Sequence, residues 1–120
     1  MENVIVEKSF KFAVKIIRLA RDLRKNNHEY ELASQLLRSG TSIGANVSES
    51  QYGQSDKDFS SKLHIALKET NETKYWLKLL TEAEVITPEA SKPLLTEVEE
   101  IKRILIAILK STNPIKQNNK

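Results

Sequence analysis

The segment QLLRSGTSIGANVSE, residues 35–49, sets the architecture of this chain. Its apolar and small residues recur at steps of three and four, the period of a helix with one face buried in a bundle. With an alanine that precedes the segment, this face comprises Ala33, Leu36, Leu37, Gly40, Ile43, Gly44 and Val47. A glycine inside a helix costs about 1 kcal/mol relative to alanine, so we expect a neighbouring helix to approach closely at both glycines. Ser42 and Ala45 make the far side of the helix small as well, which indicates a second packed neighbour.

Length and composition restrict the class of protein. A chain of 120 residues is long enough for one domain with a hydrophobic core. Cysteine is absent, which excludes disulfides and thiolate metal sites and fits a reducing cytoplasm. No apolar run approaches the roughly 20 residues that a membrane span needs, and the patch at residues 4–6 is shorter than a secretion-signal core. We therefore expect a cytoplasmic protein that makes no membrane contact.

The first two helices are predicted from caps and apolar periodicity. After a lead-in, residues 1–7, the first helix is expected to begin near Ser9, a suitable N-cap, and to end near Asn26. The second helix follows from residue 29 to residue 50, and Gly53 suits a left-handed cap after it.

The last two helices carry stronger start signals. Ser55 is predicted to cap the third helix, and Thr87 followed by Pro88 begins the fourth, which ends near Ser111. The third helix has a seam at alternating steps of four and three: Phe59, Leu63, Ala66, Thr70, Thr73, Leu77 and Leu80. The seam of the fourth comprises Leu94, Val98, Ile101, Leu105 and Ile108. Residues 104–109 are apolar nearly all round, more than a bundle buries, which indicates a subunit contact.

These elements predict an all-α fold. Helices of about 18 to 29 residues joined by short turns favour antiparallel neighbours, hence an up-down-up-down four-helix bundle. The bundle is expected to span residues 8–112 and to be followed by a disordered basic tail, residues 113–120.

Side chains with catalytic or metal-binding chemistry are sparse. A di-metal site in a bundle needs Glu-x-x-His on two helices, and neither His28 nor His64 completes that motif. Gly40 and Gly44 lack the following Lys-Ser/Thr of a phosphate-binding loop. No serine has a histidine at a spacing suited to nucleophilic activation. We therefore predict a protein that is not an enzyme and holds no metal and no cofactor.

Positive charge is concentrated in the first helix. Residues 8–25 hold seven Lys and Arg against one acid, Asp22. The candidate nucleic-acid-binding residues lie opposite the apolar face: Lys8, Lys11, Lys15, Arg18 and Lys25. Such a face either stays solvated or contacts phosphates, and phosphate contact gives salt-sensitive, sequence-independent binding. Aromatic residues are not interleaved with the cations, so base stacking on single strands is not favoured.

A second polar group lies on the helices after the first. Arg38 and Glu49 are eleven residues apart, about 16 Å at 1.5 Å per residue, so each requires a partner on another helix or subunit. Glu69 and Glu72 lie on one stripe of the third helix with Trp76. Structural ion pairs are the favoured interpretation of the charges, and interface packing is the favoured interpretation of the tryptophan.

The stretches QLLRSGTSIGANVSES and SDKDFSSKLHIALKETNETKYWLKLL resemble a family of four-helix-bundle proteins encoded in intervening sequences of bacterial 23S rRNA genes. The family motif falls on Gln35, Leu36, Arg38, Ser39, Ser42, Ile43, Ala45, Asn46, Glu49, Asp58, Phe59, Glu72, Thr73, Trp76 and Leu77. The glycine that often follows the motif glutamate is Ser50 here. The resemblance covers about residues 8–110.

The resemblance implies a ring-like homopentamer of four-helix bundles without established catalytic residues. A relative, the accessory protein of diversity-generating retroelements, binds nucleic acid and assists a reverse transcriptase. The partners implied here are further copies of the chain, RNA or DNA, and a nucleic-acid-processing enzyme. The alternative function is a protein-interaction scaffold or accessory subunit without nucleic-acid affinity, in which the basic face only keeps the protein soluble.

Overall fold

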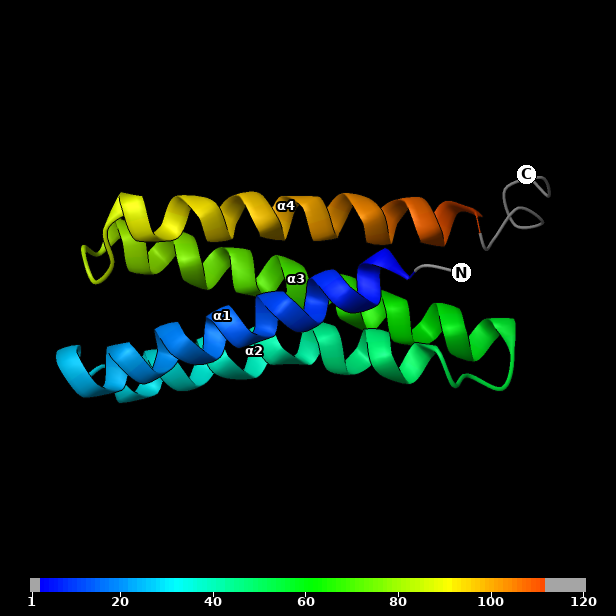
Figure 1. Ribbon diagram of the computed structural model, residues 1–120, viewed down its shortest axis with the longest axis horizontal. Coiled ribbons are helices and arrows are strands. Elements are labelled where there is room, and N and C mark those ends of the chain that lie inside the picture. The colour runs from blue at the N-terminus through cyan, green and yellow to red at the C-terminus, as the bar shows by residue number, and fades with distance from the viewer. Residues whose placement is uncertain (1–2, 112–120) are drawn as a thin grey trace.

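The computed structural model describes residues 3–111 as four helices, with no strand among those residues. The helices are α1 (Val4–Asn27), α2 (Tyr30–Ser50), α3 (Asp56–Glu82) and α4 (Pro88–Ser111). They lie side by side, with the α1–α2 and α3–α4 connections at one end of the bundle and the α2–α3 connection at the other (Figure 1). None of these helices is long and apolar enough to cross a membrane. The predicted tail, residues 113–120, lies outside the described residues.

The core is built from one buried stripe of each helix, as the apolar periodicity predicts. The largest fully buried side chains are Phe12, Ile16, Leu23, Leu36, Ile43, Leu63, Leu77, Leu80, Ile101, Leu105, Val47 and Val98. The predicted α2 face is confirmed, with Leu37 and Gly44 only partly buried. In α4 the last buried residue of the seam is Leu109 instead of Ile108, which is partly buried.

The two glycines of α2 lie where α1 approaches most closely. A Cβ atom on Gly40 would lie 2.7 Å from Cγ2 of Ile16. A Cβ atom on Gly44 would lie 3.2 Å from the backbone carbonyl oxygen of Ser9. The expected close neighbour of α2 is therefore α1.

Two predicted helix ends are wrong. The first helix begins at Val4 and not near Ser9, because Ile5 is buried in the core and extends the apolar face toward the N-terminus. Ser9 is buried inside the helix, where its hydroxyl donates to the carbonyl of Ile5 at 2.7 Å. Gly53 does not adopt the predicted left-handed conformation, since no glycine in the described part of the chain has a positive φ. A Cβ atom there would lie 3.1 Å from the backbone nitrogen of Phe59, so the tight passage into α3 favours glycine.

The two predicted start signals are confirmed. The hydroxyl of Ser55 accepts a hydrogen bond from the Asp58 backbone N–H at 3.1 Å. The hydroxyl of Thr87 accepts one from the Ala90 backbone N–H at 3.1 Å. Each cap satisfies an N–H group that has no partner within its helix.

Candidate nucleic-acid interface

Two of the candidate cations on α1 contact carboxylates of α4. The ammonium group of Lys8 lies 2.9 Å from Glu100, and that of Lys15 lies 2.5 Å from Glu97. The hydrogen bond and positive charge of Lys8 hold the pKa of Glu100 below its usual value, with the charge of Arg103 adding to the effect. A phosphate that binds either lysine must compete with a carboxylate.

The remaining candidates differ along the helix. Lys11 pairs with Glu7 one turn earlier, at 3.0 Å between Nζ and Oε2. Arg18 and Lys25 are exposed and make no ion pair or hydrogen bond with the residues that the structure describes. The three lysines in the N-terminal half of the face are therefore matched by three carboxylates, whereas the cations in the C-terminal half are not.

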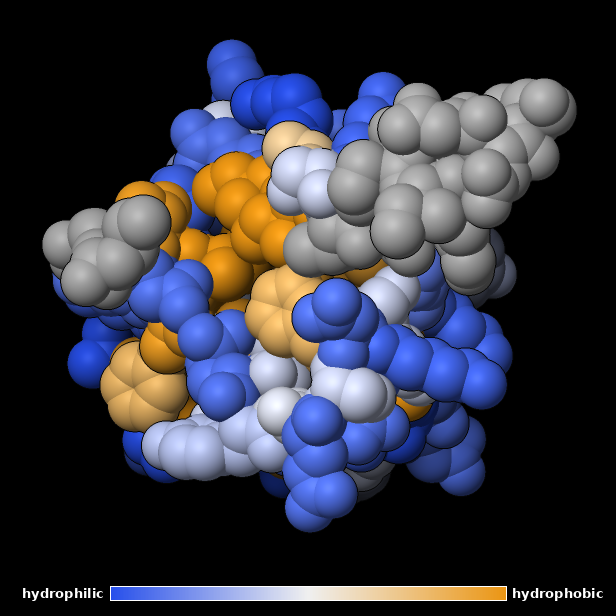
Figure 2. Space-filling view, turned by 90° about the vertical axis from the view of Figure 1, so that its right-hand side faces the viewer, coloured by the Kyte–Doolittle hydropathy of each residue, from blue (hydrophilic) through white to orange (hydrophobic). Residues whose placement is uncertain are grey.

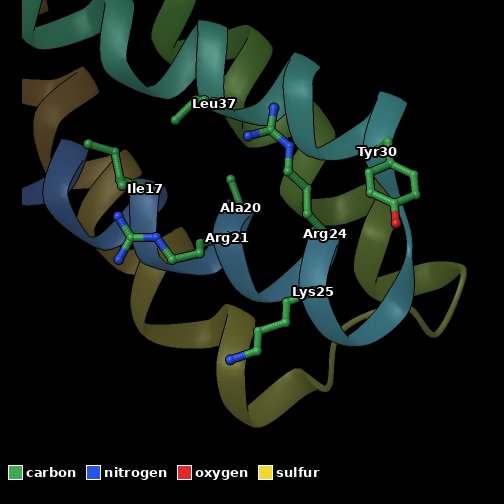
Figure 3. Close-up of a pocket in the computed structure, with 7 residues that line it drawn as sticks. All are labelled: Ile17, Ala20, Arg21, Arg24, Lys25, Tyr30 and Leu37. Carbon is green, nitrogen blue, oxygen red and sulfur yellow. The ribbon is translucent and has the colours of Figure 1, made fainter.

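A cleft between α1 and α2 lies beside this unmatched half of the face. The α1–α2 cleft has a volume of about 470 Å³ and is lined by Ile17, Ala20, Arg21, Arg24, Lys25, Tyr30 and Leu37. Figure 3 shows the first five residues extending from α1, whereas Tyr30 and Leu37 belong to α2. The candidate binding residues included Lys25 but not Arg21, which the helical period places on the same basic face, and sequence reasoning missed Arg24 and Tyr30. Their basic and aromatic character is a sequence signal, but the cleft exists only because the α1–α2 turn places Tyr30 beside α1.

The motif arginine of α2 is held by two acids of α3. Nη1 of Arg38 lies 3.3 Å from Oε1 of Glu69, and Nη2 contacts Oε2 of Glu72. The indole N–H of Trp76 donates to the same Glu72 oxygen at 3.0 Å. The structural interpretation of Arg38, Glu69 and Glu72 is therefore confirmed, and the partly buried tryptophan adds a second donor to the cluster.

The other motif contacts also join α2 to α3. Glu49 pairs with Lys62 at 2.8 Å, which raises the pKa of that lysine chiefly through the hydrogen bond. In the core between the helices, the hydroxyl of Thr73 donates to the Ser39 hydroxyl at 3.0 Å. Arg38 and Glu49 thus each have a partner on another helix, as their separation along α2 requires.

Within residues 3–111 no group of three or more histidines and acids could hold a metal ion. Nδ1 of His28 lies 3.1 Å from the Tyr30 hydroxyl, and Nδ1 of His64 lies 2.9 Å from the Ser60 carbonyl oxygen. Both histidines thus have local partners on the bundle surface.

Apolar side chains are exposed at several places on the single chain. Figure 2 shows apolar groups gathered at the end of the bundle where α1 begins and α4 ends, on an otherwise largely hydrophilic face. Val4 at this end is half-exposed, and Phe10 on α1 is 69% exposed. On α4, Ile104 and Ile106 are partly buried, so contacts within the chain account for part of the apolar excess there.

These features define a four-helix-bundle protein whose polar clusters join its helices and whose unmatched cations lie at one end of α1. The chain belongs to the 23S rRNA-intervening sequence protein family, whose model matches residues 1–107. This confirms the family that the motif residues predict.

A similar solved structure is that of a protein with unknown function from the S23 ribosomal protein family of Bacteroides thetaiotaomicron. It is 47% identical in sequence and has a TM-score of 0.87. The match covers 88% of this chain and 98% of that one. A search of curated proteins found no significant match.

Proposed function

We propose that this protein is a non-enzymatic, cytoplasmic bundle protein that binds structured RNA or other nucleic acid through the basic face of α1. The observation that carries the proposal is the exposure of Arg18 and Lys25 without a carboxylate partner among the described residues. A phosphate can contact these two cations without breaking an existing ion pair.

The geometry of α1 suits contact with several phosphates. Lys8 and Lys25 are seventeen residues apart, about 26 Å along a helix at 1.5 Å per residue. Arg18 and Lys25 supply the first contacts, and Lys11, whose partner lies on the exposed surface of the same helix, exchanges Glu7 for phosphate at small cost. Lys8 and Lys15 contribute less because each already binds a carboxylate of α4.

We also propose that the bundle is antiparallel, with up-down-up-down order, and assembles into a ring-like homopentamer. The alternation of connections between the two ends of the bundle supports the helix order (Figure 1). Apolar groups are exposed at the end of the bundle where α1 begins and α4 ends (Figure 2). These groups and the exposed Phe10 on α1 support association of the chain with further copies of itself. A ring repeats the basic face in each subunit, so one nucleic acid can engage several faces at once and gain avidity.

The test is binding of a labelled RNA hairpin to the full chain, measured by fluorescence anisotropy over a range of salt concentrations. We expect the logarithm of affinity to fall linearly with the logarithm of salt, by about 0.7 to 0.9 per phosphate neutralised. Reversal of Arg18 and Lys25 together to glutamate should weaken binding strongly while changing the melting temperature little, because neither residue has an ion-pair partner among the described residues and exposed charges contribute little to stability. The matched control reverses Lys68 and Lys78, which are exposed on α3.

The pairing of α1 lysines with α4 favours one alternative function. If Lys8 and Lys15 serve mainly to hold α1 against α4, the protein is a scaffold or accessory subunit whose partners are proteins, such as a nucleic-acid-processing enzyme. Absence of RNA and DNA binding by the wild-type chain at low salt would refute the nucleic-acid proposal and leave the scaffold function.

A further inference from the structure

The α1–α2 cleft combines a cationic surface with an apolar one, a combination that a merely solvated helix face does not require. Its lining contains three cations, Arg21, Arg24 and Lys25, and no carboxylate. Apart from Tyr30, the rest of the lining is an apolar floor formed by Ile17, Ala20 and Leu37. Its volume of about 470 Å³ falls within the range of about 300 to 1,000 Å³ that is typical of small-molecule sites.

The cations keep most of their hydrogen-bonding capacity. Arg21 and Lys25 have no ion pair or hydrogen bond with any described residue. Nη2 of Arg24 donates to the Ser34 hydroxyl at 2.9 Å, which directs the guanidinium from α1 toward α2, as Figure 3 shows, and leaves its other N–H groups available.

A structural role accounts for only part of this arrangement. Arg24 and Lys25 lie in the last turn of α1, where cations interact favourably with the negative end of the helix dipole. That interaction does not explain Arg21, one turn earlier, or the aromatic ring that lies beside the cations. Tyr30 is 57% exposed, and its hydroxyl is already hydrogen-bonded to His28, so the ring face is the part of the side chain that remains to bind another molecule.

We propose that the α1–α2 cleft binds a nucleotide, with the phosphates on the three cations and the base against the apolar floor and the ring of Tyr30. A guanidinium group can bind phosphate through two parallel hydrogen bonds. Three cations also suit a ligand with more than one negative charge, such as a di- or triphosphate, better than a single carboxylate. An inorganic anion leaves the apolar floor unused, whereas a nucleotide carries a planar base and negative charge in one molecule. The nucleotide is either free or an unpaired residue of a strand; only in the second case does the inference rest on the proposed function.

The experiment is isothermal titration of the full chain with adenosine diphosphate, inorganic pyrophosphate, adenosine and a five-nucleotide single-stranded RNA. We expect adenosine diphosphate to bind at least about tenfold more tightly than pyrophosphate or adenosine. Pyrophosphate lacks the contacts of the base, and adenosine lacks the contacts of the phosphates. If the cleft instead takes an unpaired residue of a strand, we expect the short RNA to bind and adenosine diphosphate not to bind.

Variants identify the cleft as the site. The double variant Arg21→Gln, Lys25→Gln should have at least about tenfold lower affinity for whichever probe the wild type binds, since at least one charge-assisted contact is lost. Tyr30→Ala should lower the affinity for the nucleotide or the short RNA but leave the affinity for pyrophosphate unchanged. Tyr30→Phe keeps the aromatic ring and should change none of these affinities. Gln substitution of Lys68 and Lys78 is the control. Because Arg21 and Lys25 have no side-chain partners in the described structure, the double variant should lose only the modest interaction of Lys25 with the helix dipole and should remain folded.

The outcomes separate this inference from the proposed function. The inference is overturned if neither adenosine diphosphate nor the short RNA binds, if binding is unchanged in the cleft variants, or if pyrophosphate binds as tightly as the nucleotide. Retention of hairpin RNA together with any of these results leaves the basic-face function intact. Binding of adenosine diphosphate by a chain that does not retain hairpin RNA supports the cleft and contradicts the basic-face function.

Discussion

Replacement of Gly40 by alanine is the sharpest test of how α1 packs on α2. In an exposed helix this change stabilises a protein by about 1 kcal/mol, because alanine has the higher helix propensity. Here the new methyl carbon would lie 2.7 and 2.9 Å from two side-chain carbons of Ile16, well inside the roughly 3.5 to 4.0 Å optimum for carbon atoms. Ile16 is fully buried, so it cannot swing into solvent to relieve the contact.

The expected magnitude is the difference between two opposing effects. Overpacking of a core costs about 1 to 3 kcal/mol, and the gain in helix propensity offsets about 1 kcal/mol of it. Gly40→Ala should therefore destabilise the protein by up to about 2 kcal/mol. In an Ile16→Ala background the two nearest carbons are absent and only Cβ of residue 16, at 3.1 Å, remains close, so the same change should stabilise by up to about 1 kcal/mol. The two backgrounds thus differ by up to about 3 kcal/mol, in the range of coupling energies for residues in contact.

The assay is urea unfolding of the wild type, both single variants and the double variant, followed by circular dichroism at one protein concentration. Ile16→Ala itself should cost about 2 to 5 kcal/mol, as for other large-to-small changes in a core. A Gly40→Ala variant that is more stable than the wild type would refute the close contact. An equal effect of Gly40→Ala in both backgrounds would show that Ile16 is not the side chain that limits the space.

Three further predictions follow from the packing, the ion pairs and the apolar surface. Gly44→Leu should destabilise by about 1 to 3 kcal/mol through overpacking against α1, and an unchanged melting temperature would place Gly44 in solvent. Because Lys8 lowers the pKa of Glu100, the stability from this pair is present above the unfolded carboxyl pKa of about 4.3 and is lost as pH falls through the folded pKa. Glu100→Gln should therefore lessen the fall in melting temperature between about pH 5 and pH 3, whereas identical profiles would show that the pair contributes nothing. Ile106→Asp should dissociate the oligomer or unfold it, since a buried unpaired charge is costly; a wild-type monomer at micromolar concentration in sedimentation equilibrium would contradict the assembly.

Local patterns in the sequence determined the helices and their buried stripes. The spacing of apolar residues in α2 and α3 fixes which side of each helix avoids water, and this depends only on the helical period. Ser55 and Thr87 mark helix starts because a capping hydroxyl acts on backbone groups within three residues of itself. The motif on α2 and α3 likewise identifies the family from the sequence alone, without any knowledge of contacts between those helices.

The tertiary structure decided which charges are matched. A helical period shows that Lys8 and Lys15 point away from the α1 core, but not that Glu100 and Glu97 of α4 lie opposite them, more than eighty residues along the chain. The same holds for the α1–α2 cleft, because its cations come from one helix and the ring of Tyr30 from the next. Periodicity gives the direction of a side chain about its own helix axis. The angle, register and separation of two packed helices arise from the summed fit of many side chains, and these determine which charged groups meet.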